Sequence, residues 1–135
     1  MILLNPTLDS AQVGLRFFVV PKTILIVEDD EDVRELAATV LADAGYLVET
    51  ARDADEAVQI MQEKLAHVVF TDIVMPGTMN GFEFAEWVKR TRPGLPVVCT
   101  SGYAAVTSGS QAACDHFIRK PYQLAAVLVL FQSLL

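Results

Sequence analysis

The sequence predicts an α/β fold built around a doubly wound parallel sheet, and three observations lead to this prediction. Short apolar runs rich in β-branched residues alternate with stretches in which apolar residues recur at helical spacing. Four of these runs end at polar residues, as buried parallel strands do where they meet a functional loop. A chain of 135 residues with 53% hydrophobic content is large enough for one domain with a single core.

The first half of the chain predicts two strands, each followed by a helix. A strand at residues 23–27 leads to Asp30, which is placed to cap a helix that ends at Gly45. A shorter, alternating edge strand is expected at residues 46–50. Asp53 and Glu56 then resemble a capping box at the start of the next helix. Helical spacing predicts buried positions in the two helices at Val33, Leu36, Ala37, Val40, Leu41, Ala44, Ala57, Ile60 and Met61.

The second half continues the alternation. Strands are expected at residues 67–71, 95–99 and 116–119, with a helix before the second of them that turns Phe84 and Val88 inward and ends near residues 92–94. Residues 104–113 are small and include Gly109, so the helix there should be short or mobile. With right-handed crossovers, the strand order 2-1-3-4-5 of flavodoxin-like folds would place strands one and three side by side.

Polar side chains gather where the predicted strands end. Glu28 and Asp29 follow the first strand, Asp72 the third, Thr100 the fourth and Lys120 the fifth. The carboxyl ends of strands in an open α/β sheet form its ligand site. Crowded carboxylates favour a hard cation such as Mg²⁺, and a lysine supplies a point charge for a phosphate. The pattern therefore predicts a site that handles phosphoryl groups.

From about Lys22 to the C-terminus, the chain resembles the receiver domain of two-component response regulators. Four motifs in order carry the resemblance, and each closes a predicted strand: residues 24–30 (ILIVEDD), 71–77 (TDIVMPG), 100–103 (TSGY) and 117–121 (FIRKP). It implies a phosphoryl group accepted by Asp72 from the phosphohistidine of a histidine kinase or histidine phosphotransfer protein. A receiver catalyses only its own phosphorylation and dephosphorylation.

The resemblance also assigns roles to individual residues. It implies Mg²⁺ held by Asp29, Asp72 and the backbone carbonyl of Val74, with Glu28 assisting. Phosphoryl oxygens would be contacted by residues that follow strands four and five, namely Thr100, Ser101 and Lys120. Thr100 and Phe117 resemble the switch pair of the family, although a Phe that is permanently part of the core is a rival interpretation. The peptide bond between Lys120 and Pro121 is often cis in such proteins.

Two positions depart from the common pattern of the family. Val74 and Gly102 stand where receivers often carry polar side chains that orient a hydrolytic water, so a long-lived phosphorylated form is expected. A phosphatase of the haloacid dehalogenase type would require a second Asp at position 74, where this chain has Val. An FMN-binding flavodoxin would require a phosphate loop rich in Ser, Thr and Gly after the first strand, where the loop of this chain is acidic. Both fit poorly. The remaining alternative is a degenerate receiver that is not phosphorylated and acts only as an interaction module.

Charge and composition limit the partners. A net charge of −7 argues against direct binding of nucleic acid, which needs clustered basic residues. No stretch reaches the length of a membrane span, and the N-terminus lacks the basic region of a signal peptide, so a cytoplasmic protein is expected. Cys99 and Cys114 are interpreted as two reduced, buried thiols, and a zinc site with His67 or His116 is not expected.

The two ends of the sequence stand apart from the domain pattern. Residues 1–21 are interpreted as an N-terminal extension to a domain of residues 22–135, either poorly ordered or packed through an apolar patch at residues 17–20. The stretch from Leu124 to Leu135 is apolar almost all round, and no output domain is expected after it. An apolar outer face on this helix would need to be covered, and we expect a second copy of the chain to cover it in a homodimer. The alternatives are that the N-terminal patch covers it, or that a missing portion of a longer protein does.

Overall fold

The structure is a computed structural model that describes residues 20–102 and 112–135. Its five strands form one parallel sheet in the order β2-β1-β3-β4-β5, which confirms the predicted fold class and strand order. The strands are β1 (Thr23–Val27), β2 (Leu47–Ala51), β3 (Val68–Asp72), β4 (Val97–Ser101) and β5 (His116–Arg119). The helices are α2 (Glu31–Asp43), α3 (Ala54–Glu63), α4 (Gly81–Thr91) and α5 (Leu124–Leu134).

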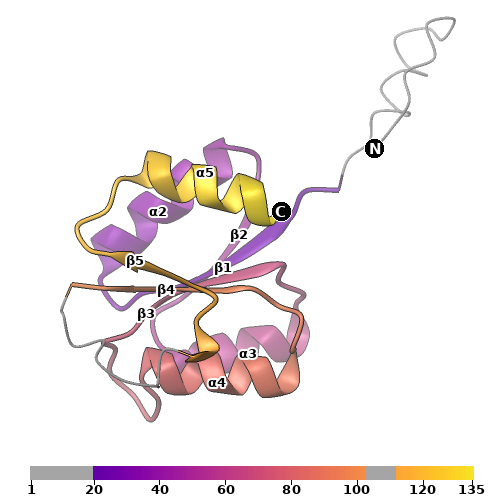
Figure 1. Cartoon of the computed structure of the whole chain (residues 1–135), viewed down its shortest axis with the longest axis vertical. Helices are drawn as coiled ribbons and strands as arrows, with labels where there is room; N and C mark the ends of the chain where they lie inside the picture. The colour runs from indigo at the N-terminus through magenta and orange to yellow at the C-terminus, as the bar shows by residue number, and fades with distance from the viewer. Residues whose placement is uncertain (1–19, 103–111) are drawn as a thin grey trace, which may run out of the picture.

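Helices cover both faces of the sheet, with α2 and α5 on one face and α3 and α4 on the other (Figure 1). Successive side chains of a strand point to opposite faces. Accordingly, Leu25 and Val27 of β1 belong to one buried cluster, and Ile24 and Ile26 belong to the other. Because both faces are buried, the strands need unbroken apolar runs, and this is the pattern that the sequence shows.

Local sequence signals explain where the helices begin and end. The Asp30 side chain accepts a hydrogen bond from the Val33 N–H and caps α2, as predicted. At the other end, Gly45 has a φ of 102° and its N–H donates to the Ala42 carbonyl, while the Tyr46 N–H donates to the Leu41 carbonyl. This pair of bonds is a Schellman motif, which requires the left-handed backbone that glycine adopts without strain.

The predicted capping box at Asp53 and Glu56 is only half formed. Asp53 accepts from the Glu56 N–H at 2.8 Å, but the Glu56 carboxylate accepts from the Arg52 N–H at 3.3 Å. A complete capping box lies instead at the start of α4. There the Asn80 side chain accepts from the Glu83 N–H, and the Glu83 side chain accepts from the Asn80 N–H.

Strands β2, β3 and β4 begin one or two residues later than the sequence predicts. The Tyr46 N–H takes part in the Schellman motif that follows α2, through its hydrogen bond to the Leu41 carbonyl, and β2 begins at Leu47. In β4, Pro96 has no N–H to donate to the ladder, and the strand begins at Val97. The shift has a consequence for the candidate site. Asp72 and Thr100 lie inside their strands, as register partners on neighbouring strands.

The predicted burial of helix positions is wrong at some of them. In α2, Ala37 and Leu41 are buried, but Leu36 is 59% exposed and Ala44 is also exposed. Within the described residues, α2 packs against β1, β2 and α5, and these neighbours cover a narrower apolar stripe than its sequence offers. In α5, Val127 and Phe131 are fully buried.

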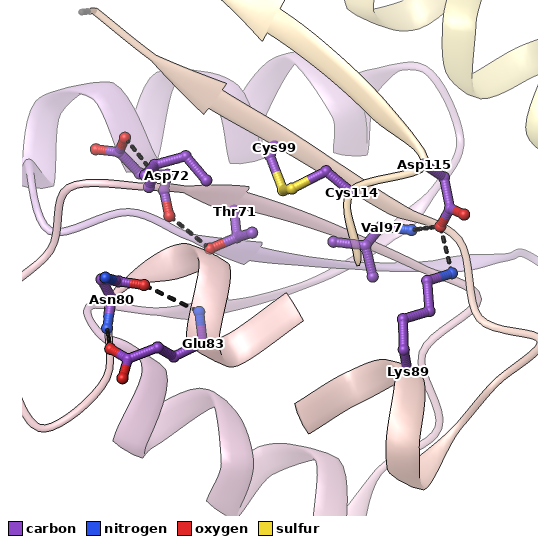
Figure 2. The surroundings of a disulfide bond; sticks show 10 residues. Thr71, Asp72, Asn80, Glu83, Lys89, Val97, Cys99, Cys114 and Asp115 are labelled. Carbon is purple, nitrogen blue, oxygen red and sulfur yellow. Dashed lines mark hydrogen bonds and ion pairs between the residues drawn. A yellow bond between two sulfur atoms is a disulfide. The ribbon is translucent and has the colours of Figure 1, made fainter. Parts of the chain in front are cut away.

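Cys99 and Cys114 form a disulfide, which corrects the expectation of two reduced thiols (Figure 2). Their Cα atoms lie 5.8 Å apart, inside the usual range for a bridged pair, although 15 positions separate them in the sequence. A sequence cannot give this distance. It arises because the chain returns beside β4 just before β5 begins.

Some expectations concern residues outside the described ranges. The apolar patch at residues 17–20 falls there except for Val20, which is 64% exposed, and so does most of the predicted helix at residues 104–113. The division into an N-terminal extension and a domain therefore stays a prediction. Within the described ranges, no helix has both the length and the apolar character needed to cross a bilayer.

Candidate functional site

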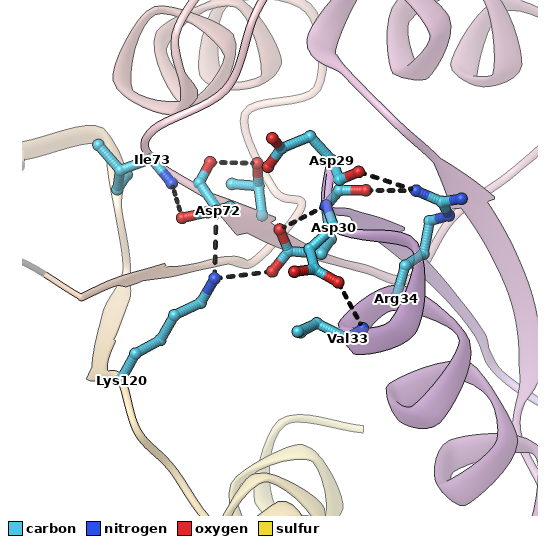
Figure 3. A network of polar contacts seen from close by, with 9 residues as sticks. Asp29, Asp30, Val33, Arg34, Asp72, Ile73 and Lys120 are labelled. Carbon is cyan, nitrogen blue, oxygen red and sulfur yellow. Dashed lines mark hydrogen bonds and ion pairs between the residues drawn. The ribbon is translucent and has the colours of Figure 1, made fainter.

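The carboxyl ends of β1, β3, β4 and β5 bring the candidate residues together at one edge of the sheet (Figure 3). Glu28 directly follows β1 and is 4% exposed, and Asp72 is the last residue of β3 and is 6% exposed. Thr100 lies in β4, and Lys120 directly follows β5. Burial of this many polar groups is unusual and requires compensating interactions.

Three carboxylates form a cluster that has the geometry of a metal site. Glu28, Asp29 and Asp72 each offer an oxygen atom, and these three atoms lie within 4.8 Å of one another. Burial raises the pKa of Asp29, and its hydrogen bond and charge contact with Glu28 raise it further. The oxygen-only donor set and the mutual repulsion of the carboxylates both fit a hard divalent cation such as Mg²⁺.

Lys120 links two members of this cluster. Its Nζ atom lies 2.7 Å from Oε1 of Glu28 and 3.2 Å from Oδ2 of Asp72. Burial lowers the pKa of Lys120, but the hydrogen bond to Glu28 and the charges of Asp72 and Glu28 outweigh this effect and raise it. Lys120 is therefore a cation aimed into the acidic cluster. The peptide bond to Pro121 is cis, as the resemblance implied.

Helix α2 holds the acidic loop in place. The Asp30 N–H donates to Oε2 of Glu28, and Nη1 of Arg34 donates to the Glu28 carbonyl at 2.8 Å. The same guanidinium lies 3.5 Å from the Asp29 carbonyl. Asp30 is thus a cap and not a member of the metal cluster, in agreement with the sequence-based expectation. Sequence reasoning did not find Arg34, because an arginine in the first turns of a helix has no motif of its own.

The backbone around Asp72 is held just as closely. The Ile73 N–H donates to Oδ1 of Asp72 at 2.8 Å, and the Thr71 hydroxyl donates to the Asp72 carbonyl. The Gly81 N–H donates to the Ile73 carbonyl, and a Cβ atom at Gly81 would lie only 2.1 Å from the Asp72 carbonyl oxygen. Gly81 is a second residue that sequence reasoning missed. It allows the start of α4 to approach the end of β3.

The loop after Asp72 is also tied to α3. Asp55 accepts from the hydroxyl of Thr78 at 2.5 Å and from its N–H at 3.3 Å, and these bonds lower the pKa of Asp55. Gly77 has a φ of 106° in this loop. The loop that carries Val74 is therefore fixed at its middle as well as at both ends.

Thr100 is a buried hydroxyl without a partner. It is 3% exposed, and its Oγ1 atom makes no hydrogen bond to any described residue. Such a group is rare in a folded protein and needs an explanation. Ser101 is also buried. Phe117 is partly buried against the core cluster of the α3–α4 face, and its register partner in β4 is Cys99.

The two positions that lack polar side chains are open to solvent. Val74 is 59% exposed, and Gly102 is exposed as well. Among the described residues, a Cβ atom at Gly102 would contact only the Cβ atom of Lys120, at 3.9 Å.

Comparisons with known proteins agree with the fold in pointing to a receiver domain. The model of the response regulator receiver domain matches residues 24–132. The nitrogen assimilation regulatory protein NtrX of Azorhizobium caulinodans is 37% identical over 117 residues, which cover 83% of this chain and 26% of NtrX. The response regulator MprA of Mycobacterium sp. (strain KMS) is 31% identical over 118 residues, which cover 85% of this chain and 51% of MprA. The chain thus spans about a quarter to a half of these relatives.

Solved structures are similar over most of the chain. TrrA of Thermotoga maritima, crystallised in complex with Mg²⁺ and BeF, has a TM-score of 0.79 at 27% identity and covers 84% of this chain and 99% of its own. The receiver domain of NtrX from Brucella abortus has a TM-score of 0.76 at 30% identity and covers 82% of this chain and 96% of its own. The chain therefore belongs to the family of response regulator receiver domains, the signalling modules of phosphorelay systems.

Proposed function

We propose that the chain is a Mg²⁺-dependent phosphoacceptor, in which Asp72 takes a phosphoryl group from the phosphohistidine of a histidine kinase or histidine phosphotransfer protein. One observation carries the proposal. The Thr100 hydroxyl is buried, makes no hydrogen bond to any described residue, and lies on the strand next to Asp72 and in register with it. A phosphoryl oxygen on Asp72 would give this hydroxyl an acceptor.

The chemistry is a transfer between two nucleophiles. An oxygen of the Asp72 carboxylate attacks the phosphorus, the bond between phosphorus and the imidazole nitrogen breaks, and its electron pair stays on the imidazole. The Ile73 N–H and the Lys120 ammonium both contact the carboxylate and fix its orientation. The chain catalyses no further reaction in this proposal beyond its own phosphorylation and dephosphorylation.

Mg²⁺ would be held by Asp29 and Asp72, with Glu28 assisting and the carbonyl of Val74 as the remaining protein ligand. The geometry of the acidic cluster supports the three carboxylates as metal ligands. The resemblance to the family supports the Val74 carbonyl as a ligand. When bound, the ion neutralises the charge that develops on the phosphoryl oxygens. Lys120 supplies a second positive charge on the same side of the site.

Phosphorylation would bias a two-state element. Thr100, Ser101 and Lys120 would turn toward the phosphoryl oxygens, and Phe117 would follow into the space that Thr100 leaves. The ion pair of Lys120 with Asp72 is the longer of its two, so it is the one most readily exchanged for a phosphoryl oxygen. A two-state element of this kind lets the charge of one phosphoryl group alter the surface that the domain presents to a partner.

Incubation with Mg²⁺ and acetyl phosphate tests the proposal. Intact mass should show one added phosphoryl group on the wild-type chain and none on Asp72→Asn. Asp43→Asn, at the exposed end of α2, makes the same chemical change outside the site and should be phosphorylated normally. Phosphorylation of Asp72→Asn to the wild-type extent would refute Asp72. A wild-type chain that is never phosphorylated would favour the alternative of a pure interaction module.

Location and other partners belong to the same proposal. We expect the protein to act in the cytoplasm, where ATP supplies the kinases that make phosphohistidine, and not to bind nucleic acid directly. Self-association through α5 is a further expectation. It is supported by Val129, an apolar residue of this helix that is 66% exposed.

A further inference from the structure

We propose that the Cys99–Cys114 pair is a redox modification site, exchanged by low-molecular-weight thiols and disulfides, and that its disulfide form resists the phosphorylated conformation. This inference rests on the proposed function, because it concerns the movement of Thr100 and Phe117 on phosphorylation. It adds a second input to the domain, which neither the fold nor the family comparison assigns.

The disulfide joins β4, which carries Thr100, to the segment just before β5, which carries Phe117. Cys99 directly precedes Thr100 in β4 and is the register partner of Phe117 in β5. Cys114 lies three residues before Phe117 and is bonded to Cys99 (Figure 2). A covalent bond therefore holds the backbone next to Thr100 against the segment that leads into Phe117. Any displacement of one relative to the other must be accommodated by the few bonds that join Cys99 to Cys114.

A second attachment keeps the same segment in place without the disulfide. The Val97 N–H donates to Oδ2 of Asp115 at 2.7 Å, and the Asp115 N–H donates to the Val97 carbonyl at 2.8 Å. Lys89 of α4 forms an ion pair with the same carboxylate, and its ammonium also donates to the Leu95 carbonyl. Reduction would thus remove a covalent restraint and leave the fold intact. This is the behaviour required of a regulatory disulfide.

The two cysteine residues differ in exposure. Cys99 is fully buried and Cys114 is partly exposed, so we infer that an incoming thiolate attacks the sulfur of Cys114. Attack forms a mixed disulfide at Cys114 and releases the Cys99 thiolate, which takes a proton. A second thiolate then attacks the mixed disulfide, which frees Cys114 and leaves the two small thiols oxidised to their own disulfide. The chain has two cysteines in all, so no third thiol within it competes.

The resting arrangement is the one in which Lys120 is paired with Asp72 and the Thr100 hydroxyl makes no hydrogen bond to a described residue. If the disulfide favours this state, thermodynamic linkage requires that ligands of the activated state favour the dithiol by the same factor. Coupling of this kind between sites in proteins is commonly about 5-fold to 150-fold. The two effects can be measured independently on the same protein.

The first measurement is the affinity for beryllofluoride in the presence of Mg²⁺, followed by ¹⁹F NMR on the full chain. Oxidised protein should bind about fivefold or more weakly than protein kept reduced with dithiothreitol. Cys114→Ser, a substitution at a partly exposed position, should bind like reduced wild type in both oxidising and reducing buffer. Equal affinities for oxidised and reduced wild type would overturn the inference.

The second measurement is the fraction of dithiol in glutathione buffers of defined ratio, counted by alkylation and mass spectrometry. Mg²⁺ with beryllofluoride should move the midpoint toward the dithiol by the factor found in the first measurement. An unchanged midpoint, or a disulfide that glutathione never reduces, would also overturn the inference. A chain that binds no beryllofluoride in either redox state would instead refute the proposed phosphoacceptor function itself.

Discussion

Lys120 makes its shorter ion pair with Glu28, at 2.7 Å, and not with Asp72, the proposed phosphoacceptor, which lies at 3.2 Å. Glu28 also accepts the Asp30 N–H, so it joins the acidic loop, the start of α2 and the end of β5. An acidic residue in this position acts on the site by fixing the lysine. It does so whether or not it contacts a metal ion itself.

We therefore expect Glu28→Gln to weaken Mg²⁺ binding by about tenfold, the lower range for loss of a residue that supports metal ligands. Isothermal titration with MgCl₂ measures the change. Glu35→Gln removes the same charge from an exposed position of α2 and should leave the affinity unchanged. A metal affinity of Glu28→Gln equal to that of wild type would contradict the supporting role.

Asp29→Asn should stabilise the metal-free protein at neutral pH and weaken Mg²⁺ binding. The folded state raises the pKa of Asp29 above 3.8, because the ionised side chain is partly desolvated and lies beside Glu28. The folded protein thus binds this proton more tightly than the unfolded chain does, and the stability due to Asp29 falls as the pH rises through the folded pKa. The gain from the substitution should shrink as the pH falls toward 3.8.

Urea midpoints between pH 4 and pH 7, measured without and with Mg²⁺, check the Asp29 prediction. Excess Mg²⁺ should reverse the order, because wild type gains binding energy that the variant loses. A variant less stable than wild type at pH 7 without metal would disprove the argument from repulsion.

Val74→Asn should shorten the lifetime of phosphorylated Asp72. The Val74 side chain is 59% exposed and cannot hydrogen-bond a water, whereas an amide at this position could orient one for attack. The effect of positioning such a water is on the order of 10²-fold at the lower end of general acid–base catalysis. Decay of the phosphorylated protein, followed by intact mass after removal of acetyl phosphate, gives the rate. Val74→Leu is the control, and decay of the Asn variant no faster than that of the control would refute the prediction.

Gly81→Ala should destabilise the domain by about 1–3 kcal/mol or more, the usual range for overpacking. The new Cβ atom would lie 2.1 Å from the Asp72 carbonyl oxygen, so β3 or α4 must shift. Gly94→Ala is a matched control, since a Cβ atom there meets nothing within 4 Å. Chemical denaturation of both variants makes the comparison. Similar stabilities for the two would show that the close approach at Gly81 is not tight.

Val129→Glu should weaken self-association of the protein if α5 forms a dimer interface. Val129 is an exposed large apolar residue of α5, whereas Phe131 is fully buried and a polar substitution there should destabilise the domain instead. Light scattering over a range of concentrations measures the change, with Gln59→Glu on the exposed surface of α3 as the control. A wild-type protein that is monomeric at every concentration would rule out the dimer.

The fold was predictable from the sequence because parallel strands covered on both faces leave a clear pattern. Ile24 to Val27 are all buried, and the run had to be apolar at every position. Strand boundaries were less accurate. Asp72 and Thr100 belong to their strands because they pair across β3 and β4. The pattern of residues within one strand does not show such pairing with a neighbouring strand. Leu36 was expected to be buried but is exposed. Helical spacing shows which side of α2 is apolar, but it does not show how much of that side the neighbouring elements cover.

In the candidate site, the charged residues were predictable and their supports were not. Glu28, Asp29, Asp72 and Lys120 stand at strand ends, and the fold brings strand ends together. Arg34 and Gly81 act through backbone carbonyls, and no side-chain motif marks such contacts. The disulfide was mispredicted because its formation depends on how the chain returns to β4, a tertiary feature that cysteine spacing does not encode.

The Thr100 hydroxyl makes no hydrogen bond to any described residue, which implies a trade-off between the stability of the domain and its proposed response to phosphorylation. Burying a hydroxyl without a partner destabilises a protein by about 1–3 kcal/mol relative to a satisfied one. Valine has nearly the same shape and would remove that penalty, so selection for a sturdier fold alone would favour it at this position. The threonine that stands there instead is the expected compromise where an activity depends on a group that the resting fold leaves unsatisfied.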